Sequence, residues 1–278
     1  MIAANLHDWI AQLGHGDRIL DLASSSGSFP VAGLACSVIA IDEDPQAFEP
    51  VAPLPNARPA RVIGRSQQLP VASASIDLVI CNHALEHFLD LDAVLDEIGR
   101  VLKPSGRLYV SVPNGHGVCD AVYRWVFEGG GHVNRFRRDD LVRRIESRVG
   151  VRLAQWQKLY SSFAYLHTVL PLLDSPSPDL QKRLQRMARL PRVLFKAAQR
   201  ALYVGTRVAD RFLGTQLAVY GWALWFDRGS APVVETPPYV NVCQFCGTGH
   251  PLESIGRLPR LAWRCPSCQG RNPLRCWP

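Results

Sequence analysis

The sequence predicts an α/β fold with a doubly wound parallel β-sheet. An apolar run at 18–22 is followed by five small residues, and a second apolar run at 38–41 ends on Asp42. This is the pattern of a strand, a tight loop, a short helix and a second strand. Further apolar runs then alternate with an amphipathic helical segment as far as residue 112. Such alternation is typical of parallel sheets that are covered by helices.

Each element follows from its local pattern. Residues 2–13 carry apolar side chains at helical spacing, and residues 14–17 stop that helix before the first strand. The segment 89–102 places its apolar residues on one helical face, with Asp90 near its start. A further helix is expected at 139–147. The first five strands are expected at 18–22, 38–41, 60–63, 76–81 and 107–112.

The composition is that of a globular protein. Of the 278 residues, 47% are hydrophobic and 20% are charged, which excludes wholesale disorder. No apolar run reaches the roughly 18 residues needed to span a bilayer, and the N-terminus lacks the basic start and apolar core of a signal peptide. We therefore expect a cytoplasmic protein without a transmembrane segment. The formal charge of +7 suits anionic partners, although an arginine-rich helix is more often a solvated face.

The first loop has the features of a nucleotide-binding turn. Small residues at 23–27 allow a ligand to approach the backbone. Asp42 follows the start of that loop by about twenty positions, which suits an acidic residue that binds ribose hydroxyls. In an open α/β sheet, ligands lie outside the carboxyl ends of the strands. The sequence therefore predicts a nucleoside-containing cofactor at this edge.

Three motifs between residues 76 and 114 carry a specific resemblance. They are I-D-L-V-I followed by A-L-E-H, the helix ending E-I-G-R-V-L-K-P-S-G, and the strand R-L-Y-V-S-V-P-N. Together with 18–44 and the turn G-H-V-N-R-F at 131–136, about 130 residues resemble class I S-adenosylmethionine-dependent methyltransferases, particularly the type 11 group. The resemblance implies a Rossmann-like sheet of seven strands, the last two at 152–158 and 217–226.

The resemblance also implies a binding site for S-adenosylmethionine. The first loop would hold the methionine end of the cofactor, with Asp21 near its amino group, and Asp42 would bind the ribose. Residues 65–67 would lie beside adenine, and Asn82 near the sulfonium. The implied cofactor residues are Asp21, Ala23, Ser25, Gly27, Asp42, Arg65, Ser66 and Asn82.

Two features depart from the family pattern. The loop D-x-G-x-G-x-G has Ala23 and Ser25 in place of its first two glycines. Ala23 is tolerated if its backbone angles are ordinary, whereas a side chain at Ser25 can crowd the methionine moiety. Arg65 stands where the family usually has an acidic residue for the adenine amino group. Two interpretations stay open: an active methyltransferase with an atypical pocket, and a degenerate, non-catalytic domain kept as a binding or scaffold protein.

Methyl transfer needs few reactive side chains from the protein. Methyl transfer is an in-line displacement in which the protein mainly positions the partners, and a base is needed only where the acceptor must lose a proton. His83 and His132 are the candidates for this base, although His83 can also cap a helix and His132 can orient a turn. We expect transfer to an oxygen or nitrogen of a small-molecule, glycan or lipid-linked acceptor. RNA or protein methylation is the alternative.

A basic, amphipathic insertion at 160–215 separates the last two expected strands. Its apolar residues between 184 and 208 recur every three or four positions, and Pro191 kinks or divides the helix. One interpretation is a helical hairpin that packs on the sheet edge and acts as a lid over a lipid-linked acceptor. The other is peripheral contact with an anionic membrane surface.

The C-terminal segment carries a metal-binding pattern. A proline-containing linker at 231–238 separates the methyltransferase-like domain, 1–230, from residues 239–278. Cys243-x-x-Cys246 and Cys265-x-x-Cys268 have the spacing of a zinc ribbon, with four thiolates around Zn²⁺. Because so short a segment buries too little core to fold alone, the zinc is expected to be structural. The ribbon is also a candidate docking site for a protein or RNA.

Overall fold

The computed structural model divides into two compact units. Unit 1 comprises Met1–Val112, Phe136–Trp156 and Ala223–Thr236, and unit 2 comprises Pro113–Arg135, Gln157–Trp222 and Pro237–Pro278. The residues that the structure describes are 6–24, 28–29, 31, 34–48, 60–126, 129, 131–160, 192–239, 241–242, 249–250, 254–255, 263–266, 269 and 271–272.

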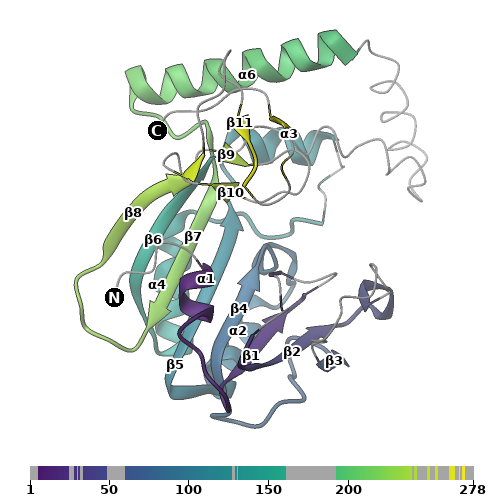
Figure 1. The fold of residues 1–278 in the computed structure, drawn as a ribbon, viewed down its shortest axis with the longest axis vertical. Helices are drawn as coiled ribbons and strands as arrows, with labels where there is room; N and C mark the ends of the chain where they lie inside the picture. The colour runs from purple at the N-terminus through teal and green to yellow at the C-terminus, as the bar shows by residue number, and fades with distance from the viewer. Residues whose placement is uncertain are drawn as a thin grey trace. The chain divides into compact units, whose positions relative to one another are not determined.

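The first five strands of the sheet are parallel, which confirms the predicted α/β fold (Figure 1). Leu20 of β1 lies opposite Ile39 of β2 on one side and Val79 of β4 on the other. Leu20 and Val79 are fully buried, as expected for strands that are covered on both faces. The five strands are β1 (Arg18–Leu22), β2 (Ser37–Asp42), β3 (Ala60–Ile63), β4 (Ile76–Asn82) and β5 (Leu102–Pro113).

Helices cover both faces of this part of the sheet. Figure 1 draws α2 (Leu91–Val101) and α4 (Arg138–Val149) on one face and α1 (Leu6–Ile10) on the other. The side chain of Asp90 caps α2 by accepting a hydrogen bond from the Ala93 amide, which satisfies one of the donors left open at a helix start. Two 3-10 helices, η1 (Pro45–Phe48) and η2 (Leu85–His87), follow β2 and β4.

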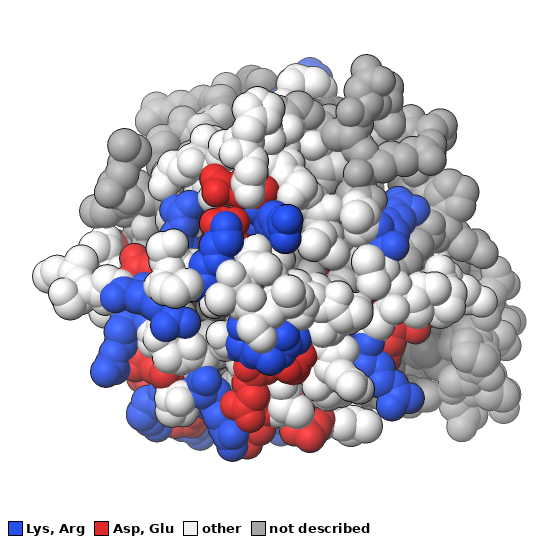
Figure 2. Space-filling view, turned by 90° about the horizontal axis from the view of Figure 1, so that it is seen from below, with Lys and Arg blue, Asp and Glu red and all other residues white. Residues whose placement is uncertain are grey.

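The arginine-rich segment at 135–152 is paired with carboxylates. Arg144 and Arg148 of α4 contact Asp92 of α2 at 2.7 and 2.9 Å, and the hydrogen bond from Arg144 is the main reason that the pKa of Asp92 is lowered. Figure 2 shows acidic and basic side chains interspersed on one face of the molecule. The other arginines of this segment with a carboxylate partner are Arg138, Arg143 and Arg152. The segment is therefore not a purely cationic surface.

The sheet has eight strands in the described ranges, not the seven that the sequence predicts. The order is β3-β2-β1-β4-β5-β7-β6-β8, and the additional strand β8 begins within the segment predicted as a linker. Its prolines suggested irregular chain, but proline is tolerated in a strand that lies at the edge of a sheet, and β8 lies at an edge. The last three strands are β6 (Arg152–Tyr160), β7 (Val219–Asp227) and β8 (Val234–Tyr239).

Unit 2 contains two helices in its described residues, α3 (Val118–Val126) and α6 (Arg192–Leu213). The latter lies within the predicted insertion, whereas residues 161–191 lie outside the described ranges. Asp210 lies in the last turn of α6, and its carboxylate accepts hydrogen bonds from the Thr215 hydroxyl and from the amides of Leu217 and Ala218. These bonds fix the chain that enters β7. Among the helices that the structure describes, none is long and apolar enough to cross a membrane.

Two short antiparallel hairpins form in the C-terminal segment. β9 (Asn241–Val242) pairs with β10 (Gly249–His250), and β11 (Trp263–Arg264) pairs with β12 (Arg271–Asn272). Along the sequence, each hairpin encloses one of the two C-x-x-C pairs. Of the four cysteines, Cys265 lies among the described residues, directly after β11.

Candidate functional site

Three of the predicted cofactor residues lie at the carboxyl ends of neighbouring strands. Asp21 is the penultimate residue of β1, and Asp42 and Asn82 are the last residues of β2 and β4. Because β1 pairs in parallel with both β2 and β4, these ends meet at one edge of the sheet. This is the edge at which open α/β sheets bind ligands.

Asp21 is buried and only half satisfied. Its Oδ2 atom accepts a hydrogen bond from the Ser28 amide at 3.0 Å, whereas Oδ1 is buried without a donor in the described part of the chain. Burial raises the pKa of Asp21 to about 6, with a smaller contribution from the charge of Asp42, while the Ser28 hydrogen bonds oppose the shift. A buried carboxylate oxygen that lacks a donor suits an ammonium group. Asp21 therefore fits the amino group of S-adenosylmethionine.

The backbone of the first loop is strained at Ala23. Its φ of +50° lies in the left-handed region that favours glycine, so the backbone angles are not the ordinary ones under which an alanine is tolerated at no cost. Ser24 is buried, and its amide donates to the Ile41 carbonyl at 3.1 Å. The predicted residues Ser25 and Gly27 lie outside the described residues.

The carboxylate of Asp42 is oriented by the chain that follows it. Oδ1 accepts a hydrogen bond from the Asp44 amide at 3.0 Å, and the side chain is half-buried. On the next loop, Ser66 is buried and Arg65 is exposed. Ser66 is therefore the better of the two candidates for contact with a base that is enclosed by protein.

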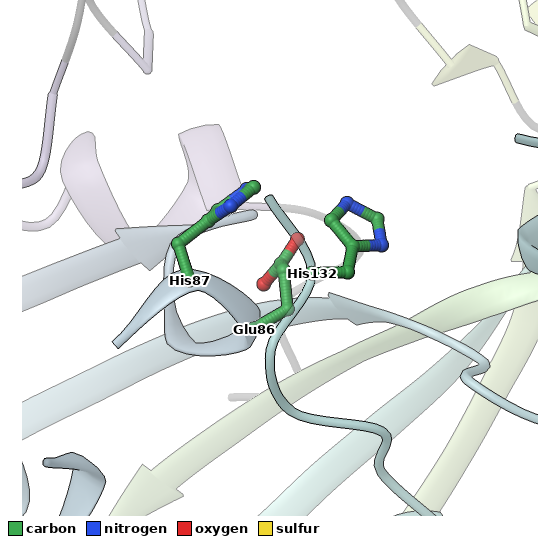
Figure 3. Close-up of side chains that lie close together, drawn as sticks. All are labelled: Glu86, His87 and His132. Carbon is green, nitrogen blue, oxygen red and sulfur yellow. The ribbon is translucent and has the colours of Figure 1, made fainter. Parts of the chain in front are cut away.

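The end of β4 is held by polar contacts to β5. The Asn82 side chain accepts a hydrogen bond from the Ser111 hydroxyl, and the His83 amide donates to the Ser111 carbonyl at 2.9 Å. His83 has a φ of +51°, and its Nδ1 lies 3.5 Å from Oε1 of Glu86. Figure 3 shows the side chains of Glu86 and His87 on η2. Glu86 is buried and His87 is exposed.

His132, in unit 2, belongs to a local group of interacting side chains. Nδ1 of His132 lies 2.8 Å from Oδ1 of Asp120 on α3, and the two side chains are 11% and 1% exposed. The ring stacks on Tyr123 with a centroid distance of 4.8 Å and an interplanar angle of 23°. Arg124 donates to the His132 carbonyl at 2.9 Å. Asp120 and Tyr123 thus fix the position of the imidazole, and Arg124 fixes the backbone of the same residue.

Comparison with known proteins gives a family match within unit 1. Residues 20–110 match the family model described as a methyltransferase domain. The match runs from Leu20 in β1 to Val110 in β5, the part of the chain that contains the five parallel strands. The matched residues include Asp21, Asp42 and Asn82, which lie at the edge where open α/β sheets bind ligands.

Relatives extend the similarity beyond this domain. The malonyl-[acyl-carrier protein] O-methyltransferase of Hahella chejuensis is 34% identical over 164 residues, which is 55% of this chain and 57% of that protein. The ubiquinone/menaquinone biosynthesis C-methyltransferase of Rubrivivax gelatinosus is 32% identical over 33% of this chain and 38% of that protein. The chain therefore spans about half or less of the length of these relatives.

Solved structures share the fold of the methyltransferase domain. A proposed methyltransferase from an antibiotic biosynthesis pathway of Anabaena variabilis aligns over 81% of this chain and 95% of its own, with a TM-score of 0.53 and 13% identity. A phosphoethanolamine N-methyltransferase of Haemonchus contortus aligns over 81% of this chain and 52% of its own, with a TM-score of 0.51 and 14% identity. At these identities the likeness concerns the fold alone.

The C-terminal cysteines are described only at Cys265. This residue is fully buried beside Trp263 and Ile255, and its Sγ atom lies 3.2 Å from Nε2 of His250. Burial lowers the pKa of His250, which favours the neutral imidazole. The other predicted zinc ligands, Cys243, Cys246 and Cys268, lie outside the described ranges.

One component of the site was missed by sequence reasoning. Asp120 lies on α3, a helix that the sequence pattern did not predict, and it precedes His132 by twelve residues. Carboxylate and imidazole groups that meet through tertiary packing have no fixed spacing in sequence. The only available signal was an acidic residue among apolar neighbours in the segment V-C-D-A-V.

Proposed function

We propose that this protein transfers a methyl group from S-adenosylmethionine to an oxygen or nitrogen of a small-molecule, glycan or lipid-linked acceptor. The observation that carries the proposal is the buried Oδ1 of Asp21 without a described donor, inside a segment that matches a methyltransferase domain. The names of the relatives support methyl transfer as the reaction, and they include both O- and C-methyltransferases.

The cofactor-binding roles follow from the positions of the strands. When bound, S-adenosylmethionine supplies an electrophilic methyl group. Asp21 would hold its ammonium group, Asp42 its ribose hydroxyls, and the half-buried Asn82 would face the reacting end. The remaining candidates for the cofactor site are Ala23, Ser25, Gly27, Arg65 and Ser66.

His132 is our candidate for the base that takes a proton from the acceptor. If the Nδ1 proton is donated to Asp120, the lone pair resides on Nε2, which can then accept a proton. The carboxylate would stabilise the imidazolium that forms, and stacking on Tyr123 would limit rotation of the ring. His83 is the second candidate, and its contact with the buried Glu86 can act in the same way.

We further propose that residues 239–278 form a structural zinc ribbon with Cys243, Cys246, Cys265 and Cys268 as ligands. The support is that, along the sequence, each C-x-x-C pair falls between the two paired strands of one short hairpin, as in ribbons whose two turns share one zinc ion. Neutral His250 beside the Cys265 sulfur would donate a hydrogen bond to a thiolate ligand. The ribbon remains our candidate for docking a protein or RNA partner.

The alternative is a degenerate domain that has lost cofactor binding. One observation favours it: the left-handed backbone angle at Ala23 places strain in the loop that must approach the cofactor. Against it, the half-satisfied carboxylate of Asp21 is an unfavourable arrangement for a protein that binds nothing there. RNA methylation gains no support from α4, because its arginines are paired with carboxylates.

Calorimetric titration with S-adenosylmethionine and S-adenosylhomocysteine tests the proposal. We expect micromolar binding of both by the unaltered protein and a loss of at least tenfold in Asp42→Ala. Glu43→Ala is the matched control, because Glu43 is the exposed neighbour of Asp42 and should bind as the unaltered protein does. Absence of binding by the folded, unaltered protein would establish the degenerate alternative.

A further inference from the structure

Helix α6 exposes an apolar face along its whole length. Leu194, Val204, Val208 and Phe212 are 60%, 44%, 49% and 76% exposed. At 3.6 residues per turn these positions fall within one arc of about 120° on the helix surface. Four small residues that are also exposed complete the same arc: Ala197, Ala198, Ala201 and Gly205. We call this set of eight residues the apolar face of α6.

Three described residues on the opposite side of α6 are polar. Thr206 is buried and donates to the Leu202 carbonyl at 2.9 Å. Arg207 stacks over the Tyr160 ring at 3.9 Å, and Asp210 binds the chain that leads into β7. A surface helix normally buries its apolar side and exposes its polar side. In α6 the positions named above show the reverse arrangement. The apolar face is therefore available to contact a surface outside the protein.

The charge of α6 indicates the nature of that surface. Its sequence contains five basic residues, Arg192, Lys196, Arg200, Arg207 and Arg211, and one acidic residue, Asp210. The carboxylate of Asp210 is already bound by three donors. A second copy of this chain, docked through the same face, would bring two cationic helices together, and juxtaposed like charges oppose such an interface. Anionic lipid headgroups would instead complement the exposed Arg211, which borders the apolar face at 100° per residue.

We propose that α6 lies flat on an anionic lipid surface, with its apolar face inserted at the boundary between headgroups and acyl chains. An amphipathic, basic helix that is not apolar enough to span a bilayer has the properties of an interfacial helix. Its 22 residues give a length of about 33 Å at 1.5 Å per residue. This inference concerns membrane attachment and does not depend on methyl transfer.

Vesicle co-sedimentation of the full-length protein tests the proposal. We expect binding to vesicles of equal parts phosphatidylcholine and phosphatidylglycerol, weaker binding to phosphatidylcholine alone, and weakening of the former as salt rises. In Phe212→Ala the affinity for anionic vesicles should fall by about tenfold, because a large apolar side chain no longer leaves water. Val208→Glu should weaken binding further.

Val233→Glu is the matched control for Val208→Glu. Val233 is 52% exposed and lies in the chain before β8, so its substitution should leave vesicle binding unchanged. Circular dichroism would confirm that all three variants keep the native fold. Equal loss in Val208→Glu and Val233→Glu, or no binding of the unaltered protein to anionic vesicles, would overturn the proposal. So would a dimer in solution that Val208→Glu converts to a monomer, because the face would then belong to a second copy.

Discussion

Asp120 places a buried carboxylate oxygen 2.8 Å from Nδ1 of His132. The carboxylate comes from α3 and the imidazole from the turn that precedes α4, so the pair depends on tertiary packing within unit 2. The second oxygen of Asp120 is buried without a donor among the described residues. A carboxylate in this position can select the Nδ1-protonated tautomer of its partner, which leaves Nε2 as the basic atom.

Asp120→Asn should change both the tautomer of His132 and the chemical step. In the unaltered protein, nitrogen NMR shifts should report a proton on Nδ1 of His132, and in the variant this preference should be lost. With an acceptor identified by screening, kcat should fall by about 10²-fold or more, because general base catalysis contributes about 10²–10⁴. The dissociation constant of S-adenosylmethionine should stay within twofold. A parallel loss of cofactor binding would indicate a structural role instead.

Cofactor binding should depend on pH through Asp21. The pKa of this carboxyl is raised to about 6 by burial, so it is ionised at pH 8 and increasingly neutral below pH 6. Only the ionised form attracts an ammonium group, and affinity for S-adenosylmethionine should fall by up to tenfold per pH unit below about 6. Calorimetric titration from pH 8 to pH 5 would measure this. An affinity that does not change with pH would contradict the assignment of Asp21 to the ammonium group.

The contribution of Asp21 to the stability of the ligand-free protein should change with pH in the opposite direction. Because the folded pKa of Asp21 lies above its unfolded value of 3.8, the folded state binds more protons between these values. This carboxyl therefore destabilises the ligand-free protein above pH 6, by on the order of 3 kcal/mol at most, and that effect is relieved as pH falls toward 4. Asp21→Asn should raise the melting temperature at pH 8 and abolish the pH dependence of cofactor binding.

The sequence pattern predicted the parallel sheet well because its strands are buried on both faces. Strands β1 and β4 begin at Arg18 and Ile76, the residues at which the sequence predicts them to begin. The strand count was wrong because prolines within 231–238 indicated a linker, whereas an edge strand accommodates them in β8. Helix α3 was missed because it is short, although glycines flank it in the sequence at 115 and 117 and at 129–131.

Some residues of the candidate site were predictable from the sequence and others were not, for the same reasons. Asp21, Asp42 and Asn82 were predictable because strand ends are visible in the sequence and parallel neighbours end at one edge. The left-handed angle at Ala23 and the pairing of Asp120 with His132 were not, because backbone strain and long-range contacts leave no periodic signal. The exposed apolar face of α6 was also hidden, since periodicity shows that a helix is amphipathic but not which side faces solvent.

Ala23→Gly should stabilise the protein, because glycine adopts a φ of +50° without the clash that Cβ makes. We expect a gain of about 1 kcal/mol in the free energy of unfolding, measured by urea denaturation. Ala74, with a φ of +51°, provides a matched control at the turn before β4. Ala74→Gly should give a similar gain, but only Ala23→Gly should also tighten binding of S-adenosylmethionine. If the two substitutions changed the affinity for S-adenosylmethionine equally, the strain at Ala23 would have no specific effect on the cofactor site.

Zinc removal should unfold the C-terminal segment and leave unit 1 intact. Metal analysis of the purified protein should give one zinc ion per chain, and Cys265→Ser should retain less of it in the presence of a chelator, because a serine hydroxyl is a much weaker zinc ligand than a thiolate. Cys36→Ser is the matched control, since Cys36 is also buried but lies in unit 1. Chelation should make residues 239–278 sensitive to protease while the affinity for S-adenosylmethionine stays unchanged. Equal zinc content in both variants would exclude Cys265 from the metal site and leave its contact with His250 as part of an ordinary apolar core.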